Sequence, residues 1–320
     1  MTLIAKLAEE DHPRRRRRRL RSMAFAPTLM TLGNLTCGFA AIHMAVRAMY
    51  DFGAGVTDQP LMVMNRALLE RTLPSFVSVG AGLVILGMVF DLFDGLLARV
   101  TRSTTHFGGQ LDSLADVVTF GVAPATLMVT VMTKELARDA ILPSPLSEHL
   151  MGRIAWVCAA VYVAFAAMRL ARYNVEHAEE DFDYRMFQGM PSPAAACVMV
   201  ALILFHDQVH DQIGATAQRA LVYAMPVIAL AIGCLMISRV PYRRFHRAYF
   251  LGRKPVSHVI TCVLILAVFL TLKTPTLLLI VLWYAVSGPA FLAIRRLRER
   301  RHPVAAPGGA ESVSDERRHA

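Results

Sequence analysis

Four aspartates lie close together in the sequence, within otherwise apolar segments of the 320-residue chain. On a helix, Asp91 and Asp94 are i, i+3 neighbours and Asp112 and Asp116 are i, i+4 neighbours, so each pair shares one face. Carboxylates inside membrane helices are rare, because each costs about 2.5–3.5 kcal/mol to insert. A single aspartate of this kind would be interpreted as a helix-end residue, whereas four together indicate a functional acidic cluster.

The chemistry open to such a cluster is that of divalent cations. Four carboxylates repel one another unless cations neutralise them, and two divalent ions balance four negative charges. The donor atoms are all hard oxygens, which favours Mg²⁺, Mn²⁺ or Ca²⁺ over zinc. Paired ions suit phosphoryl transfer, since they stabilise the attacking and the leaving oxygen. Gly95 and Gly108 permit close approach of a phosphate substrate, and Arg99 supplies a cation for its oxygens.

A divalent-cation transporter is the alternative from another functional class, because an acidic cluster inside a membrane also serves as an ion path. Transport does not require the neighbouring Gly95, Arg99 and Gly108. These three residues therefore favour an enzyme that acts on a phosphate compound. The two interpretations differ in what they predict, since only the transporter moves metal ions across sealed vesicles.

The composition indicates what kind of protein must position these residues. Hydrophobic residues make up 55% of the chain and charged residues 18%, against about 25% charged in soluble domains. This excludes a disordered chain, a collagen-like chain and most soluble enzymes. A bilayer core of about 30 Å needs about 20 apolar residues per helix. The chain is therefore predicted to be an all-α membrane bundle of about eight transmembrane helices, at residues 28–49, 75–99, 110–132, 153–171, 191–206, 219–238, 256–272 and 276–294.

The basic residues predict how these helices are oriented. With the N-terminus in the cytoplasm, most of the 34 Lys and Arg residues fall on the cytoplasmic side. An odd number of spans would place the basic cluster 295–301 on the opposite side. We therefore expect a multi-pass protein of the inner (cytoplasmic) membrane with both termini in the cytoplasm. The connection 100–109 then brings the two aspartate pairs together at the cytoplasmic interface.

The net charge of +10 would suggest nucleic acid in a soluble protein, but here the basic clusters flank apolar segments. Anionic membrane lipid is therefore the expected partner, and nucleic acid is not. The basic run 14–19 is interpreted as a topology anchor that also concentrates anionic lipid. The five cysteines form no CxxC pair and are interpreted as small packing residues.

The acidic cluster and its neighbours resemble the signature of the CDP-alcohol phosphotransferase family. The matching residues are Asp91, Asp94, Gly95, Ala98, Arg99, Gly108, Asp112 and Asp116. These integral membrane enzymes transfer a substituted phosphate from a CDP-linked donor to an alcohol and release CMP. The segments 31–39, 111–124, 169–175 and 187–195 are similar to those of the bacterial type II phosphatidylserine synthases. The donor in that subgroup is CDP-diacylglycerol, and the acceptor is the hydroxyl of L-serine.

The resemblance implies roles for individual residues. The four aspartates would hold two ions per site, Mg²⁺ or Mn²⁺, and Asp116 would also act as the general base. The CDP donor would contact Thr31, Asn34, Gly95, Ala98, Arg99 and Gly108. The candidates for binding the acceptor serine are Arg169, Arg172, Asn174 and Ser192. An Arg fork matches the serine carboxylate in geometry, although anchoring of the helix end is the alternative explanation for both arginines.

The resemblance covers roughly residues 25–240 and predicts four segments. These are a basic cytoplasmic arm (1–24), the CDP-alcohol phosphotransferase membrane domain (25–240), a basic cytoplasmic loop with two further transmembrane helices (241–298), and a disordered cytoplasmic tail (299–320). The predicted activity is metal-dependent transfer of the phosphatidyl group from CDP-diacylglycerol to L-serine. Other acceptors remain as alternatives within the family, namely glycerol phosphate, inositol phosphate and choline. The family also suggests a homodimer.

Overall fold

The computed structural model of the chain describes residues 25–53, 73, 75–101, 106–138, 150–178, 187–209, 214–242 and 274–301. Within these ranges the protein is helical apart from short connections, and seven helices are long and apolar enough to cross a membrane. The predicted all-α membrane bundle is therefore confirmed. The predicted span 256–272, the basic arm 1–24 and most of the tail lie outside the described residues.

The elements follow one another along the chain with few interruptions. The long helices are α2 (Phe25–Gly53), α4 (Phe76–Thr101), α7 (Leu150–Ala178), α8 (Ser192–Val209), α9 (Ala215–Ile237) and α12 (Thr274–Arg301). Between α4 and α7 one further span is assembled from α5 (His106–Asp116), the π-helix η1 (Val117–Val122) and α6 (Ala123–Arg138). Two short strands, β1 (Phe187–Gln188) and β2 (Pro241–Tyr242), pair antiparallel.

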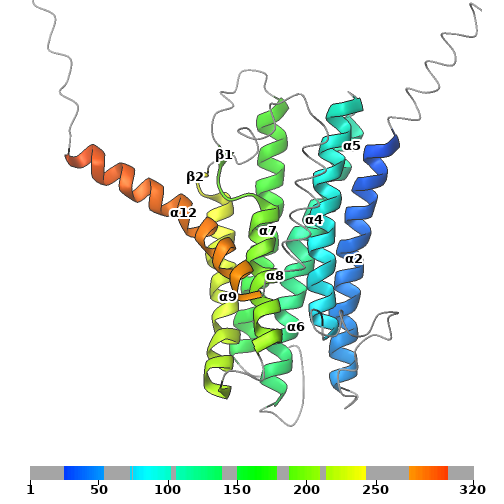
Figure 1. Ribbon diagram of the computed structural model, residues 1–320, viewed down its shortest axis with the longest axis vertical. Helices are drawn as coiled ribbons and strands as arrows, with labels where there is room; N and C mark the ends of the chain where they lie inside the picture. The colour runs from blue at the N-terminus through cyan, green and yellow to red at the C-terminus, as the bar shows by residue number, and fades with distance from the viewer. Residues whose placement is uncertain are drawn as a thin grey trace, which may run out of the picture.

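The helices from α2 to α9 alternate in direction through the bundle (Figure 1). The start of α2, the end of α4 and the start of α5 therefore lie at the same end of the molecule. α12 begins part-way along the bundle, beside the end of α8, where the side chains of Thr274 and Gln208 hydrogen-bond, and it runs outward from the bundle towards its C-terminus (Figure 1).

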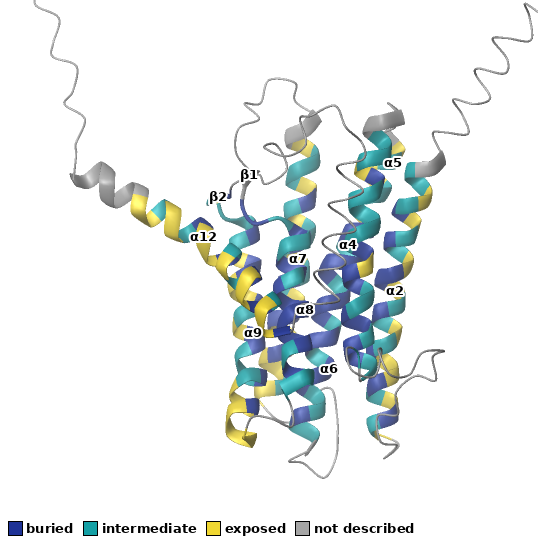
Figure 2. Ribbon diagram, viewed as in Figure 1, coloured by how far each residue is buried: buried dark blue, intermediate teal, exposed yellow. Residues whose placement is uncertain are grey.

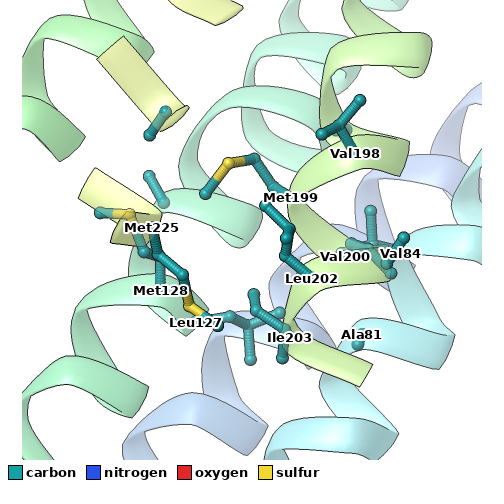
Figure 3. Close-up of a cluster of buried hydrophobic side chains, with 14 of the residues drawn as sticks. Ala81, Val84, Leu127, Met128, Val198, Met199, Val200, Leu202, Ile203 and Met225 are labelled. Atoms are coloured by element: carbon teal, nitrogen blue, oxygen red, sulfur yellow. The ribbon is translucent and has the colours of Figure 1, made fainter. Parts of the chain in front are cut away.

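The apolar core is centred on α8, the shortest of the predicted spans. Most of its residues from 195 to 204 are buried, including Met199 and Ile203 (Figure 2). They lie among Leu127 and Met128 of α6, with Met225 of α9 nearby (Figure 3). Helices at the rim instead expose large apolar side chains, as expected for contact with lipid.

Candidate active site

The C-terminal halves of α4 and α5 bring the acidic residues together. One carboxylate oxygen from each of Asp91, Asp112 and Asp116 lies within 4.8 Å of the other two. The carboxyl groups of Asp94 and Asp112 are within hydrogen-bonding reach of each other. The two aspartate pairs, which are separated in the sequence, therefore form one cluster at the end of the bundle where α2 begins.

Two polar residues of α2 hold this cluster from the side. The Thr31 hydroxyl donates a hydrogen bond to Asp94 Oδ2 at 3.0 Å, and Asn34 Nδ2 donates one to Asp116 Oδ1 at 3.1 Å. Both side chains are buried, and Asn34 is 0% exposed. The resemblance assigns these two residues to the CDP donor. In the structure their polar groups contact the carboxylates, which fixes the orientation of Asp94 and Asp116.

Asp116 is the last residue of α5, and the π-helix η1 follows it directly. A π-helical turn is wider than an α-helical turn and recurs at functional sites. In η1 the Thr119 hydroxyl donates to the Asn34 carbonyl at 2.9 Å. From α7, the buried Tyr162 hydroxyl donates to the Phe120 carbonyl at 2.9 Å. These bonds hold the backbone that follows Asp116 against α2 and α7.

Two glycines let η1 approach its neighbours closely. A Cβ added at Gly38 of α2 would lie 2.8 Å from the Thr119 Cα, and one added at Gly87 of α4 would lie 2.6 Å from Thr119 Cγ2. Any larger residue would push η1 away from α2 or α4 and so displace Asp116. Gly38 and Thr119 lie in the segments that resemble the bacterial type II phosphatidylserine synthases, but neither residue had a predicted role. That resemblance was the signal in the sequence that could have identified both residues.

On the other side of the cluster, α7 contributes a partly buried arginine, Arg169. Arg169 Nη1 donates a hydrogen bond to Ser192 Oγ at 2.7 Å, and its guanidinium interacts electrostatically with Asp91 and Asp116. Ser192 is the first residue of α8 and is buried. Two of the four predicted acceptor residues are thus in contact with each other and beside the carboxylates.

The other two predicted acceptor residues tie helices together. Arg172 Nη1 donates to the Ile237 carbonyl at the end of α9 at 3.2 Å, where a cation also complements the helix dipole. Asn174 Nδ2 donates to Ser113 Oγ of α5 at 2.8 Å. Neither contact requires a substrate. Ser113 had no predicted role, although it lies in the similar segment 111–124, as Thr119 does.

The predicted donor side of the site is open. Gly95 is exposed, and a Cβ added there would have no atom within 4 Å among the described residues, apart from its chain neighbours and the backbone of its own helix. Ala98 and Gly108 are half-buried. Arg99 belongs to α4 by its backbone, but its side chain lies outside the described residues. Packing within the described protein therefore gives no reason for a glycine at position 95.

The residues present fit a hard divalent cation. Asp112 Oδ1 is buried and has no hydrogen-bond partner among the residues that the structure describes. A buried carboxylate oxygen without a partner is costly unless a cation binds it. The nearby ligand atoms are all carboxylate oxygens, the donor type that Mg²⁺, Mn²⁺ and Ca²⁺ prefer.

Comparison with known proteins places the site in a family. Residues 24–237 match the CDP-alcohol phosphatidyltransferase family. A CDP-diacylglycerol–serine O-phosphatidyltransferase of Helicobacter pylori (strain ATCC 700392 / 26695) is 31% identical over 204 residues, which is 64% of this chain and 76% of that protein. The enzyme with the same name from Bacillus subtilis (strain 168) is 27% identical over 225 residues, which is 70% of this chain and 93% of that protein.

A similar relation holds to an archaeal protein of the same name. In Methanocaldococcus jannaschii the identity is 28% over 169 residues, which is 53% of this chain and 66% of that protein. The family match covers more than half of the chain and includes all four aspartates together with Thr31, Asn34, Arg169 and Ser192. The carboxylate cluster thus lies within the part of the chain that matches the family, and the chain is a membrane enzyme of the CDP-alcohol phosphatidyltransferase family.

Proposed function

We propose that this enzyme transfers the phosphatidyl group from CDP-diacylglycerol to the hydroxyl of L-serine, with release of CMP, and that it requires divalent cations. The observation that carries the metal-dependent transfer is the convergence of carboxylate oxygens from Asp91, Asp112 and Asp116, where Asp112 Oδ1 is buried and has no hydrogen-bond partner among the described residues. The choice of serine is supported by the relatives, since all three named above are CDP-diacylglycerol–serine O-phosphatidyltransferases.

The four aspartates would hold two ions, Mg²⁺ or Mn²⁺. When bound, such ions supply Lewis-acid stabilisation of the negative charge that develops on phosphate oxygens. Thr31 and Asn34 keep the carboxylates of Asp94 and Asp116 in one orientation through their hydrogen bonds. The open space at Gly95 accommodates the CDP part of the donor, beside Ala98, Arg99 and Gly108.

Asp116 is proposed as the general base. A serine hydroxyl is a poor nucleophile at neutral pH, so a carboxylate that accepts its proton accelerates attack. Asp116 lies one helical turn further along α5 than Asp112, and it interacts with Arg169 on the acceptor side. The serine oxygen forms a bond to the phosphorus that bears diacylglycerol, the bond from that phosphorus to CMP breaks, and the hydroxyl proton passes to Asp116.

Arg169 and Ser192 are proposed to bind the carboxylate of serine. The guanidinium already donates to a neutral hydroxyl, and a charge-assisted bond to a carboxylate is stronger. Arg172 and Asn174 contribute to the acceptor side by holding α9 and α5 in place. The site faces the cytoplasm in this proposal, because the basic arm 1–24 joins α2 at the same end of the bundle.

A panel of acceptors tests the proposal. Purified protein is incubated with CDP-diacylglycerol, Mn²⁺ or Mg²⁺, and serine, glycerol phosphate, inositol phosphate or choline, and CMP release is measured. We expect release with serine, loss of release with a chelator, and recovery when metal is added back. Release with another alcohol but not with serine would overturn the choice of acceptor. Metal flux in sealed vesicles without CMP release would favour a transporter.

A further inference from the structure

The C-terminal helix α12 lies beyond the segment that matches the family, yet it is tied to the bundle near the acceptor side. Tyr242 of β2 donates a hydrogen bond to the Ala285 carbonyl of α12 at 2.9 Å. Its ring packs over Gly288, where an added Cβ would lie 2.5 Å from the ring. The rings of Tyr242 and Tyr284 lie 5.7 Å apart between centroids, at 42°. The contacts of Tyr242 with α12 therefore fix the position of the Tyr284 ring.

The same strand is held to the segment that leads into Ser192. β1 and β2 pair, and the Gly189 N–H donates to the Val240 carbonyl at 3.0 Å. Gly189 has φ +86°, and a Cβ there would lie 2.2 Å from the Met236 carbonyl oxygen, so this close approach requires glycine. Tyr242 therefore connects α12 with the chain that presents Ser192 to Arg169.

Tyr284 also lies within electrostatic range of the acceptor side. Its phenol and the Arg169 guanidinium interact electrostatically, as do Arg169 and Asp116. Burial raises the pKa of Tyr242 to about 12, so Tyr242 remains a neutral hydrogen-bond donor and leaves no charge beside Tyr284. A phenol oxygen accepts hydrogen bonds, whereas a guanidinium only donates them. The two groups are chemically matched.

We propose that Tyr284 is a positioning residue for Arg169, and that α12 thereby completes the side of the site that binds the carboxylate of the acceptor. The inference rests on the proposed function, because it assigns Arg169 to the acceptor. Tyr284 contacts no reacting atom in this account. It limits the orientations of a long side chain that also contacts Ser192 and interacts with the aspartates, so its loss affects acceptor binding more than the chemical step.

The test compares two aromatic substitutions at adjacent positions of α12. Tyr284→Phe removes only the hydroxyl, and Trp283→Phe changes a side chain that is 80% exposed and serves as the matched control. The KM for serine should rise about 3- to 10-fold in Tyr284→Phe, the size of one lost polar interaction, with kcat and the KM for CDP-diacylglycerol unchanged. Trp283→Phe should match the wild type.

A double-mutant comparison separates the positioning of Arg169 from a general loss of structure. In an Arg169→Lys background, Tyr284→Phe should have no further effect on the KM for serine, because its partner is already changed. The proposal would be overturned if the two substitutions raised the KM for serine by factors that multiply in the double variant. An unchanged KM for serine in Tyr284→Phe would overturn it as well. If the wild-type enzyme uses another alcohol and not serine, the proposed function fails. The same comparison is then made with that alcohol, and an unchanged KM for it overturns the role of Tyr284.

Discussion

Gly95 offers a direct steric test of where the CDP donor lies. It is the next residue after Asp94 and one helical turn after Asp91, so it shares a face of α4 with a carboxylate of the cluster. Outside its own helix, a methyl group added there meets no atom of the described residues within 4 Å. Gly95→Ala should therefore fold without strain, and any loss of activity must come from a substrate that needs the same space.

The two expected effects have opposite signs. Replacing glycine by alanine inside a helix stabilises a protein by about 0.5–1 kcal/mol. Forcing a methyl group against a bound donor costs about 1–3 kcal/mol, the usual price of overpacking, which corresponds to about a 5- to 150-fold rise in the KM for CDP-diacylglycerol. The variant should thus be more stable and less active, a combination that misfolding cannot produce.

The assay pairs thermal unfolding in detergent with CMP release at varied donor concentration. Gly53→Ala is the matched control, because its added Cβ also meets nothing within 4 Å and it lies at the end of α2 remote from the aspartates. The control should keep the wild-type KM. A Gly95→Ala enzyme with the stability gain but a KM for CDP-diacylglycerol within twofold of the wild type would refute the placement of the donor.

Four further outcomes are expected. Asp116→Asn should lower turnover about 10²–10⁴-fold with donor affinity nearly unchanged, whereas Asp91→Asn should weaken metal and donor binding together. Recovery of Asp116→Asn turnover in excess metal would make Asp116 mainly a ligand. Tyr162→Phe should lower the free energy of unfolding by about 1–3 kcal/mol, because a buried carbonyl of η1 loses its donor; unchanged denaturation curves would contradict this. The pKa of Tyr242 is about 12 when folded against about 10 when unfolded, so its contribution to stability is present below pH 10 and is lost as the pH rises through 12. Thermal unfolding should show this alkaline loss in the wild type and less of it in Tyr242→Phe, and equal losses would refute it. A reporter fused after Ile294 should be cytoplasmic, and a periplasmic signal would contradict an even number of spans.

The acidic cluster could be predicted because its signal is local. Asp91 and Asp94, like Asp112 and Asp116, share a face by helical spacing alone, and charge inside apolar segments marks them. The contact of Thr119 with Gly38 could not be predicted in the same way. It depends on how α2 and η1, which are far apart in the sequence, are aligned against each other. It also depends on a π-helical turn, which no residue type predicts.

Residue type and spacing also leave the partner of a polar side chain open. Arg169 and Arg172 are i, i+3 neighbours at the same end of α7, and the sequence offers both equally as ligands for a carboxylate. In the structure the Arg169 guanidinium lies beside Ser192 and the aspartates. The Arg172 guanidinium, one helical turn further along α7, instead donates to the last carbonyl of α9. The difference arises from where α8 begins and α9 ends, which is a property of packing. An Arg172→Lys variant, which keeps the charge at the end of α9, should therefore affect stability more than the KM for serine, and Arg169→Lys should do the reverse. A serine KM raised equally by both variants would mean that the two arginines share the acceptor.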